Sequence, residues 1–159
     1  MSGYDGPVDQ PFRDGWLLTG DLGHVTPEGY LVIHGRKKEL IATAYGKKVY
    51  PDRVEALLRQ IPDVTEAMLV GEGRPYCSAV LWTRTGAASD RIAQGVEHVN
   101  AQLSHAEQVK RWLVLADDLS IERGDLTPNL KLKRSAVAAR YAAEIQTLYA
   151  VVPQAAAVR

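Results

Sequence analysis

The stretch Gly35-Arg36-Lys37-Lys38-Glu39-Leu40-Ile41 divides the chain into two parts of different character. A short run that favours turns and strands precedes it, and an alternation of strand and helix patterns follows it. Three cationic side chains stand in a row between a glycine and an apolar segment, which is a poor place to bury charge. The stretch therefore predicts either an exposed basic turn between two strands or a bend that holds an anion.

The composition excludes several classes of protein. The 159 residues are enough for one domain and a little more. Nineteen basic and nineteen acidic side chains cancel, which argues against a general nucleic-acid-binding protein. The single cysteine, Cys77, lies in an apolar run and favours a buried structural thiol in a reducing, cytoplasmic location. No apolar run approaches the roughly 20 residues that span a bilayer, and the first residues lack a signal-peptide pattern.

The first part predicts a loop followed by a β-hairpin. Residues 1–14 are rich in glycine, proline and aspartate and favour a loop. Residues 22–26 and 30–34 predict two strands, joined by a tight turn at Pro27-Glu28-Gly29. A two-stranded hairpin is marginally stable in water, so we expect it to lie on another surface. Asp21, at one end, is either an ordinary hairpin carboxylate or an acceptor for a pair of hydroxyl groups, such as those of a ribose.

The second part predicts a small domain of the α/β (α+β) class. The expected strands cover residues 39–44, 65–71, 76–83 and 109–116. The expected helices begin at Pro51, at residue 90 with Ser89 as its N-cap, and after residue 134. The last helix is predicted to be continuous, because one apolar stripe runs along it, formed by Val137, Tyr141, Ile145 and Leu148. This order fits a three-stranded sheet with helices packed on it.

The polar features of the chain fall on its predicted loops. They are Asp21, Arg36-Lys37-Lys38, Gly46-Lys47-Lys48, Lys131 and Lys133-Arg134. Such a set favours a site for an anion, without saying which anion. Gly71-x-Gly73 is not a phosphate loop, because it lacks a third glycine and Pro75 stands where a helix would begin. His98 and His105 have no partner at metal-ligand spacing, so no metal site is expected.

Three stretches together resemble a known family. GWLLTGDLGHVTPEGYLVIHGRKKELI (residues 15–41) looks like the end of the large domain and the hinge of AMP-forming acyl-CoA synthetases, in the adenylate-forming superfamily. GKKVYPDRVEALL (46–58) is similar to the segment after that hinge. LTPNLKLKR (126–134) resembles the C-terminal lysine motif in its long-chain fatty acyl-CoA synthetase form. The resemblance covers residues 1 to 145.

The resemblance implies a division of the chain. Residues 1–37 would be the C-terminal end of the adenylation N-domain, with its loop and β-hairpin. Residues 38–150 would be the mobile C-terminal domain, and residues 151–159 a frayed tail.

The resemblance also implies roles for five residues. Asp21 matches the aspartate that binds the ribose hydroxyls of ATP, and Arg36 matches an arginine that contacts the same nucleotide. Lys38 matches the hinge about which the C-terminal domain rotates between two half-reactions. Gly46 matches the glycine whose loop lines the pantetheine path in the thioester-forming state. Lys131 matches the catalytic lysine that bridges the substrate carboxylate and the α-phosphate during adenylation.

The implied reaction has two steps and needs more than this sequence. A carboxylic acid attacks the α-phosphate of ATP, with Mg²⁺ assisting, and gives acyl-AMP and pyrophosphate. The thiol of CoA, or of the phosphopantetheine of an acyl carrier protein, then attacks acyl-AMP. The family's phosphate loop, adenine and acyl pockets and magnesium-binding glutamate are not found in these 159 residues.

We therefore expect a fragment or split subunit that is inactive without an N-terminal adenylation domain. Two alternatives stay open. The first is a non-catalytic interaction module that docks a carrier protein or a partner enzyme. The second is an unrelated α/β domain that matches the motifs by chance. The surface of the bare hairpin could also form a homodimer.

Overall fold

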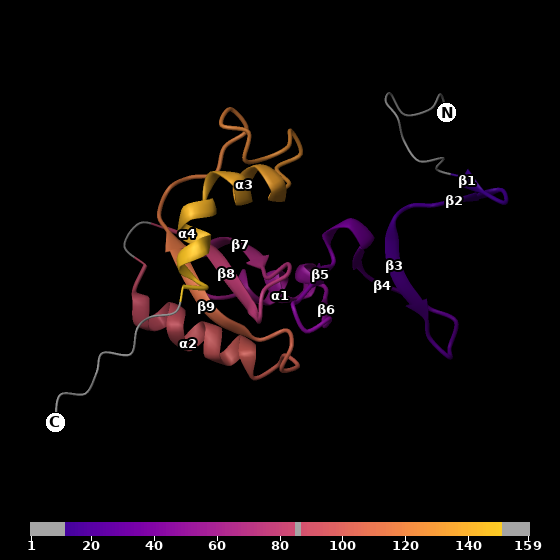
Figure 1. Ribbon diagram of the computed structural model, residues 1–159, viewed down its shortest axis with the longest axis horizontal. Coiled ribbons are helices and arrows are strands. Elements are labelled where there is room, and N and C mark those ends of the chain that lie inside the picture. The colour runs from indigo at the N-terminus through magenta and orange to yellow at the C-terminus, as the bar shows by residue number, and fades with distance from the viewer. Residues whose placement is uncertain (1–11, 85–86, 151–159) are drawn as a thin grey trace.

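The computed structural model describes residues 12–84 and 87–150 of the chain. These residues form an arm of short strands (residues 12–36) and an α/β body (residues 37–150), and the arm projects from one side of the body (Figure 1). The predicted tail, residues 151–159, lies outside the described residues. None of the described helices has the length and apolar character needed to cross a membrane.

The arm contains two antiparallel hairpins. Strands β1 (Phe12–Arg13) and β2 (Trp16–Leu17) pair around Asp14-Gly15, whose φ angles are +51° and +80°. Two positive φ angles make a tight hairpin turn that suits an Asp-Gly pair. The predicted loop over residues 1–14 is therefore wrong for its last residues, because residues 12–14 form the first strand and the turn of a hairpin.

The predicted β-hairpin over residues 22–34 is confirmed. Strands β3 (Asp21–Val25) and β4 (Leu31–Arg36) are antiparallel and pair Asp21 with Arg36 at one end. At the other end, the Gly29 amide donates to the Thr26 carbonyl oxygen over 2.9 Å. The turn residue Gly29 has a φ of +89°, a value that glycine adopts without steric cost.

The chain then enters the body through a short irregular segment. Residues Lys37–Glu39 form one turn of 3₁₀ helix, followed by strands β5 (Ile41–Ala42) and β6 (Lys48–Val49). The predicted strand over residues 39–44 is therefore too long. The Gly46 amide donates to the Thr43 carbonyl oxygen over 2.8 Å, and this turn ends β5 after two residues.

A three-stranded sheet lies at the centre of the body, as predicted. Strand β8 (Cys77–Thr83) pairs antiparallel with β7 (Val64–Val70) and parallel with β9 (Val109–Leu115). All seven residues of β8 are buried. A central strand covered on both faces explains its nearly continuous apolar sequence.

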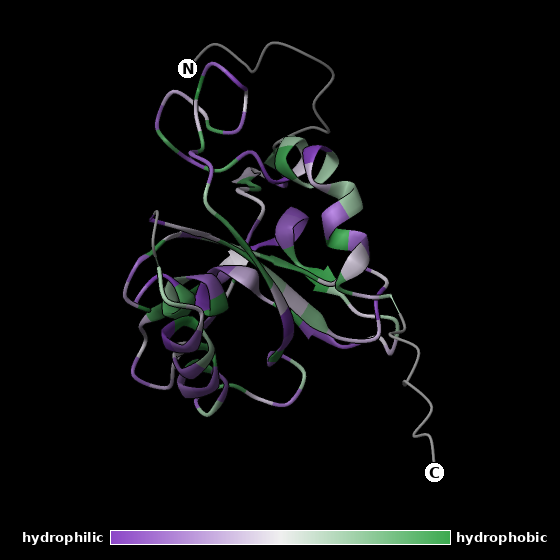
Figure 2. Cartoon of the chain, turned by 90° about the vertical axis from the view of Figure 1, so that its left-hand side faces the viewer, coloured by the Kyte–Doolittle hydropathy of each residue, from purple (hydrophilic) through white to green (hydrophobic). Residues whose placement is uncertain are grey.

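Helices cover both faces of the sheet (Figure 2). Helices α1 (Pro51–Leu58) and α2 (Ser89–Asn100) pack on the face that carries Ala79 and Leu81. Helices α3 (Arg134–Arg140) and α4 (Ala142–Thr147) pack on the opposite face, which carries Val80 and Trp82. The two faces follow from the alternation of side chains along β8.

Two predicted details of the helices are wrong. Ala88, in place of Ser89, is the N-cap of α2, and no side chain caps it. The predicted single last helix is broken at Tyr141, where φ is −100° and ψ is 25°. The Tyr141 hydroxyl donates to the Asp117 carboxylate and its ring packs edge-on against Trp82, so tertiary contacts hold the residue that interrupts the helix.

Candidate functional site

Asp21 and Arg36 form an ion pair where the arm meets the body. Their opposite positions in the β3–β4 register place Arg36 Nε 3.5 Å from Asp21 Oδ1. The backbone N–H of Asp21 donates to Thr19 Oγ1 over 3.1 Å, and the Lys37 N–H donates to the Gly20 carbonyl oxygen over 2.8 Å. The structure therefore brings together the two residues that the resemblance assigns to the nucleotide.

Lys131 lies near the tip of a small hairpin-like loop. The Thr127 N–H donates to the Lys131 carbonyl oxygen over 2.8 Å, and the Lys131 N–H donates to Thr127 Oγ1 over 3.1 Å. Leu130 has a φ of +58°, which turns the chain back at the tip. The Lys131 side chain is exposed, and no carboxylate among the described residues pairs with its ammonium group. It is free to engage an anion supplied from outside.

Arg36 and Lys131 line one cavity of about 470 Å³. The other charged side chains around it are Glu39, Asp52, Glu55, Arg59, Glu66 and Arg134. Residues far apart in the sequence thus meet at one place, and Arg36 links that place to Asp21. Cations close to such a cavity can stabilise a phosphate or carboxylate group.

Lys38 lies at the start of the body, where it joins the arm. It occupies the 3₁₀ turn, which buries none of its residues and is flanked by extended backbone at Arg36 and Leu40. Few contacts therefore oppose a change of backbone angles there. Lys38 lines a different groove, of about 850 Å³, between the 38–41 segment and helices α3 and α4.

The arm and the body also touch directly beside this segment. The His34 and Tyr50 rings lie 5.3 Å apart, centre to centre. A Cβ atom on Gly35 would lie 3.1 Å from Asp52 Oδ2, and the φ of Gly35 is +147°. Glycine at this position thus permits the close approach of β4 to the start of α1.

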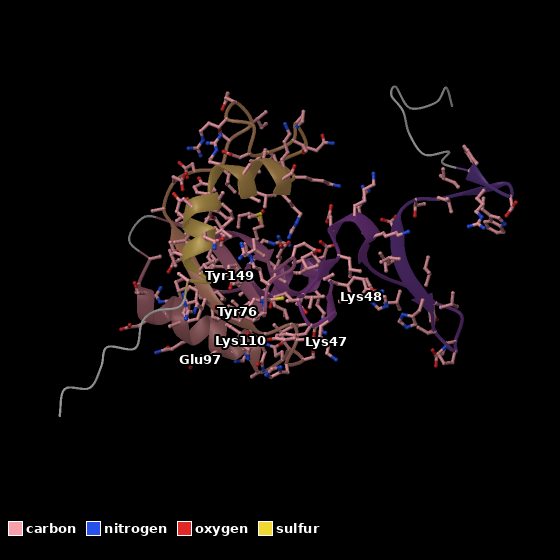
Figure 3. The ribbon with its side chains drawn as sticks, viewed as in Figure 1. Lys47, Lys48, Tyr76, Glu97, Lys110 and Tyr149 are labelled. Carbon is pink, nitrogen blue, oxygen red and sulfur yellow. The ribbon has the colours of Figure 1, made fainter. Side chains whose placement is uncertain are left out.

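Gly46 lies apart from Lys131. Its φ of +72° fits the turn between β5 and β6. Lys47 beside it lines a third cavity, of about 520 Å³, with Tyr45, Tyr76, His105 and Lys110. Figure 3 shows Lys47, Tyr76 and Lys110 on the same part of the body. This cavity shares no residue with the Arg36–Lys131 cavity, so the structure does not bring Gly46 and Lys131 together.

The 520 Å³ cavity has a basic lining, of which the sequence predicted only the part at Lys47. Lys47, Lys110 and His105 contribute nitrogen, and no aspartate or glutamate lines it. Lys110 Nζ donates to Gln108 Oε1 over 2.7 Å. The Gly46-Lys47-Lys48 motif marked one side of this cavity. The position of Lys110 at this cavity could not be predicted from the sequence, because it depends on the parallel pairing of the neighbouring Val109 with Cys77 of β8.

Two buried carboxylates near Lys131 also escaped the sequence prediction. Glu55 on α1 is 5% exposed and Asp125 is 1% exposed. Burial raises the pKa of Glu55, and the Arg134 guanidinium beside it opposes that rise. In the part of the chain that the structure describes, no three side chains of histidine, cysteine, aspartate or glutamate come together as metal ligands.

Comparison with known proteins gives a consistent result. The family described as AMP-binding enzyme C-terminal domain matches residues 38–152. The long-chain-fatty-acid–CoA ligase FadD15 of Mycobacterium tuberculosis is 37% identical over 176 residues, which cover 94% of this chain and 29% of that protein. The putative fatty-acid–CoA ligase fadD11 of the same species is 38% identical and is matched over 28% of its length. The chain thus spans less than a third of these relatives.

Solved structures show the same fold. The adenylation domain of a carboxylate reductase from Mycobacterium chelonae superposes with a TM-score of 0.79 and 24% identity, over 88% of this chain and 24% of that one. The equivalent domain from Segniliparus rugosus, solved with AMP and a carboxylic acid, gives a TM-score of 0.76 and 26% identity over 87% and 24%. The chain belongs to the AMP-binding enzyme C-terminal domain family of the adenylate-forming superfamily.

Proposed function

We propose that this chain supplies the C-terminal part of an ATP-dependent acid–thiol ligase, with Lys38 as its hinge and Lys131 as its catalytic lysine. The observation that carries the proposal is the shared cavity of Arg36 and Lys131, with Asp21 paired to Arg36. A carboxylate suited to ribose hydroxyls and an arginine, both before the hinge in the chain, thereby meet an unpaired lysine that comes after it.

Lys131 would act in the adenylation step. A carboxylate oxygen forms a bond to the α-phosphorus of ATP while the bond to the leaving pyrophosphate breaks. Both reactants are anionic, so their repulsion opposes the attack. An ammonium group between them stabilises the transition state, and loss of one such group in an enclosed site costs about 10²–10³-fold in rate.

An N-terminal domain would complete the site. It would supply the adenine and acyl pockets and hold the Mg²⁺ that assists adenylation. The arm offers a surface for it, because several large apolar side chains there are exposed: Phe12, Trp16, Leu17, Leu18, Val25, Tyr30, Leu31, Val32 and Ile33. Trp16 is 78% exposed, and a patch of such side chains is typical of an interaction surface.

The thioester step would use another face of the body. Rotation about Lys38 would withdraw Lys131 and bring the Gly46 turn to the acyl-AMP. The basic 520 Å³ cavity beside that turn fits the phosphate groups of CoA or of carrier-protein phosphopantetheine. Two separate cavities, one at Lys131 and one at Gly46, support a division of the two half-reactions between two faces.

Reconstitution tests the proposal. The chain is mixed with the separately produced N-terminal portion of a relative such as FadD15, with a long-chain fatty acid as substrate. ATP–pyrophosphate exchange and thioester formation are each expected to exceed the activity of the N-terminal portion alone. Absence of any gain would contradict the proposal and leave the non-catalytic interaction module.

The Lys131→Ala variant tests whether the lysine acts in the adenylation step. It is expected to slow adenylation by about 10²-fold or more. Thioester formation from supplied acyl-AMP should stay unchanged, since the lysine would have left the site in that step. Lys133→Ala removes a lysine from the same loop and serves as the matched control. Equal adenylation by Lys131→Ala and the unaltered chain would show that the role given to Lys131 is wrong.

A further inference from the structure

A buried junction ties the Lys131 loop to two other elements of the body. Arg134, the first residue of α3, places Nη1 2.5 Å from Glu55 Oε1 on α1. Its Nη2 donates to the Leu69 carbonyl oxygen on β7 over 2.7 Å. The Leu69 N–H in turn donates to Glu55 Oε1 over 2.6 Å. One guanidinium therefore connects the end of the loop to a helix and to the central sheet.

The junction is costly to break. Glu55 is 5% exposed, and burial disfavours its ionised form, as the raised pKa of its carboxyl shows. A buried carboxylate that loses its charged partner is strongly destabilised. Arg134 is therefore held in one place by two charge-assisted contacts, to the Glu55 carboxylate and to the Leu69 carbonyl oxygen.

The other end of the loop is fixed in a similar way. The Asp125 carboxylate, 1% exposed, lies 3.2 Å from Arg123 Nε and 3.3 Å from Arg140 Nε. Its backbone carbonyl oxygen accepts a bond from the Lys133 N–H over 2.8 Å. The segment 126–133 is thus anchored on both sides, and only its tip extends into solvent.

We propose that Arg134, through its pair with Glu55, is a positioning residue that sets the reach of the Lys131 ammonium group. This inference rests on the proposed role of Lys131 in adenylation. A lysine has a flexible four-carbon stem, so its useful position depends on the backbone that carries it. Supporting contacts hold a catalytic group within about 0.5 Å of its productive place, and a displacement of about 1 Å can cost 10²-fold.

The location of the junction fits this role better than a purely structural one. Glu55 and Arg134 line the same 470 Å³ cavity as Arg36 and Lys131. The junction therefore fixes the loop relative to the wall that carries Arg36, the proposed nucleotide contact. Arg134 follows Lys131 by three residues, so a shift of its backbone would also move the backbone that carries the lysine.

The test uses a double variant that keeps the fold. Arg134→Met alone leaves a buried, unpaired Glu55 and is expected to unfold the chain. Glu55→Gln combined with Arg134→Met removes that charge, while the glutamine oxygen can still accept the Leu69 N–H. Asp63→Asn combined with Arg91→Met is the matched control, because it removes an exposed pair with a 2.9 Å contact whose residues do not line the Arg36–Lys131 cavity.

Two measurements follow on these variants. Hydrogen exchange in the isolated chain is expected to become about tenfold faster for the hydrogen-bonded amides of Thr127, Leu130, Lys131 and Lys133 and to stay unchanged in β8. With the N-terminal portion added, adenylation is expected to slow about tenfold or more, while thioester formation from supplied acyl-AMP stays unchanged. Arg134→Lys keeps the charge and loses the planar fork, so it should give an intermediate adenylation rate.

The outcomes separate this inference from the proposed function. A folded double variant with unchanged loop exchange and unchanged adenylation overturns the positioning role. Equal slowing of both half-reactions together with a lower melting temperature also overturns it, because that pattern belongs to a structural role. If the unaltered chain supports no adenylation, the proposed function fails, and unchanged loop exchange still overturns the anchoring by Arg134.

Discussion

Asp21 and Arg36 face each other across the β3–β4 hairpin, with Arg36 Nε 3.5 Å from Asp21 Oδ1. The Arg36 side chain is 63% exposed, and exposed pairs of this kind contribute about 0–1 kcal/mol to stability. Under the proposed function, the pair is therefore weak enough to open when a nucleotide offers hydroxyl groups to the aspartate and phosphate oxygens to the arginine.

Asp21→Asn should weaken nucleotide binding without weakening the fold. The amide can no longer accept two charge-assisted bonds, each worth about 1.5–3 kcal/mol. We expect the affinity of the reconstituted enzyme for AMP to fall about tenfold or more, measured by titration calorimetry. Asp63→Asn, which alters a remote exposed pair with Arg91, serves as the control. An unchanged affinity in Asp21→Asn would remove Asp21 from the nucleotide site.

Charge reversal at Lys47 and Lys110 should affect only the thioester step. Both side chains line the basic cavity beside Gly46, so glutamate there would repel the phosphates of CoA. We expect the KM for CoA to rise about tenfold at low salt and the difference to shrink as ionic strength increases. The rate of ATP–pyrophosphate exchange should not change.

Arg84→Glu is the control for this charge reversal. Arg84 is exposed and follows the last residue of β8, at the end of the sheet away from Lys110. An equal rise in the KM for CoA in Arg84→Glu would indicate a general electrostatic effect in place of a site at Lys47 and Lys110.

Much of the body could be predicted from local patterns. The apolar run of β8 predicts a buried strand, and Pro51 at the first position of α1 predicts where that helix begins. The β3–β4 hairpin follows from its Pro-Glu-Gly turn. The Asp14-Gly15 pair is an equally clear turn signal in the sequence. The hairpin of β1 and β2 was nevertheless not predicted, because the glycine, proline and aspartate residues around this pair favour a loop.

The remaining differences depend on contacts between distant residues. The break at Tyr141 arises where its hydroxyl meets Asp117, and no helix periodicity contains that information. Glu55 has the pattern of an ordinary polar residue on an amphipathic helix. Its burial becomes apparent only when Arg134, 79 residues later, reaches it. The residues of the candidate site that belong to a motif, such as Lys131, were thus predictable. The contact between Glu55 and Arg134 was not, because the packing of distant segments creates it.

Gly95→Ala should destabilise the body through overpacking. A Cβ atom at residue 95 would lie 2.5 Å from Ile61 Cγ2 and 2.9 Å from Ile61 Cγ1. Ile61, three residues after α1 ends, is buried, so it has little room to move away. We expect a loss of about 1–3 kcal/mol in the free energy of unfolding, measured by urea denaturation. Ile61→Ala removes both γ carbons, so the double variant should lose less stability than the sum of the two single changes. An unaltered free energy of unfolding in Gly95→Ala would show that helix α2 can shift.

Cys77 should resist alkylation until the solution is strongly basic. Burial raises the pKa of its thiol from 9.0 to about 11, with a smaller contribution from the charge of Glu107. Because the folded state holds this proton more tightly, the stability it contributes is complete below pH 9 and is lost as the pH rises toward 11. Iodoacetamide should therefore label the folded chain slowly at pH 8 and the urea-unfolded chain rapidly. Rapid labelling of the folded chain at pH 8 would show that the β8 end of the sheet opens readily.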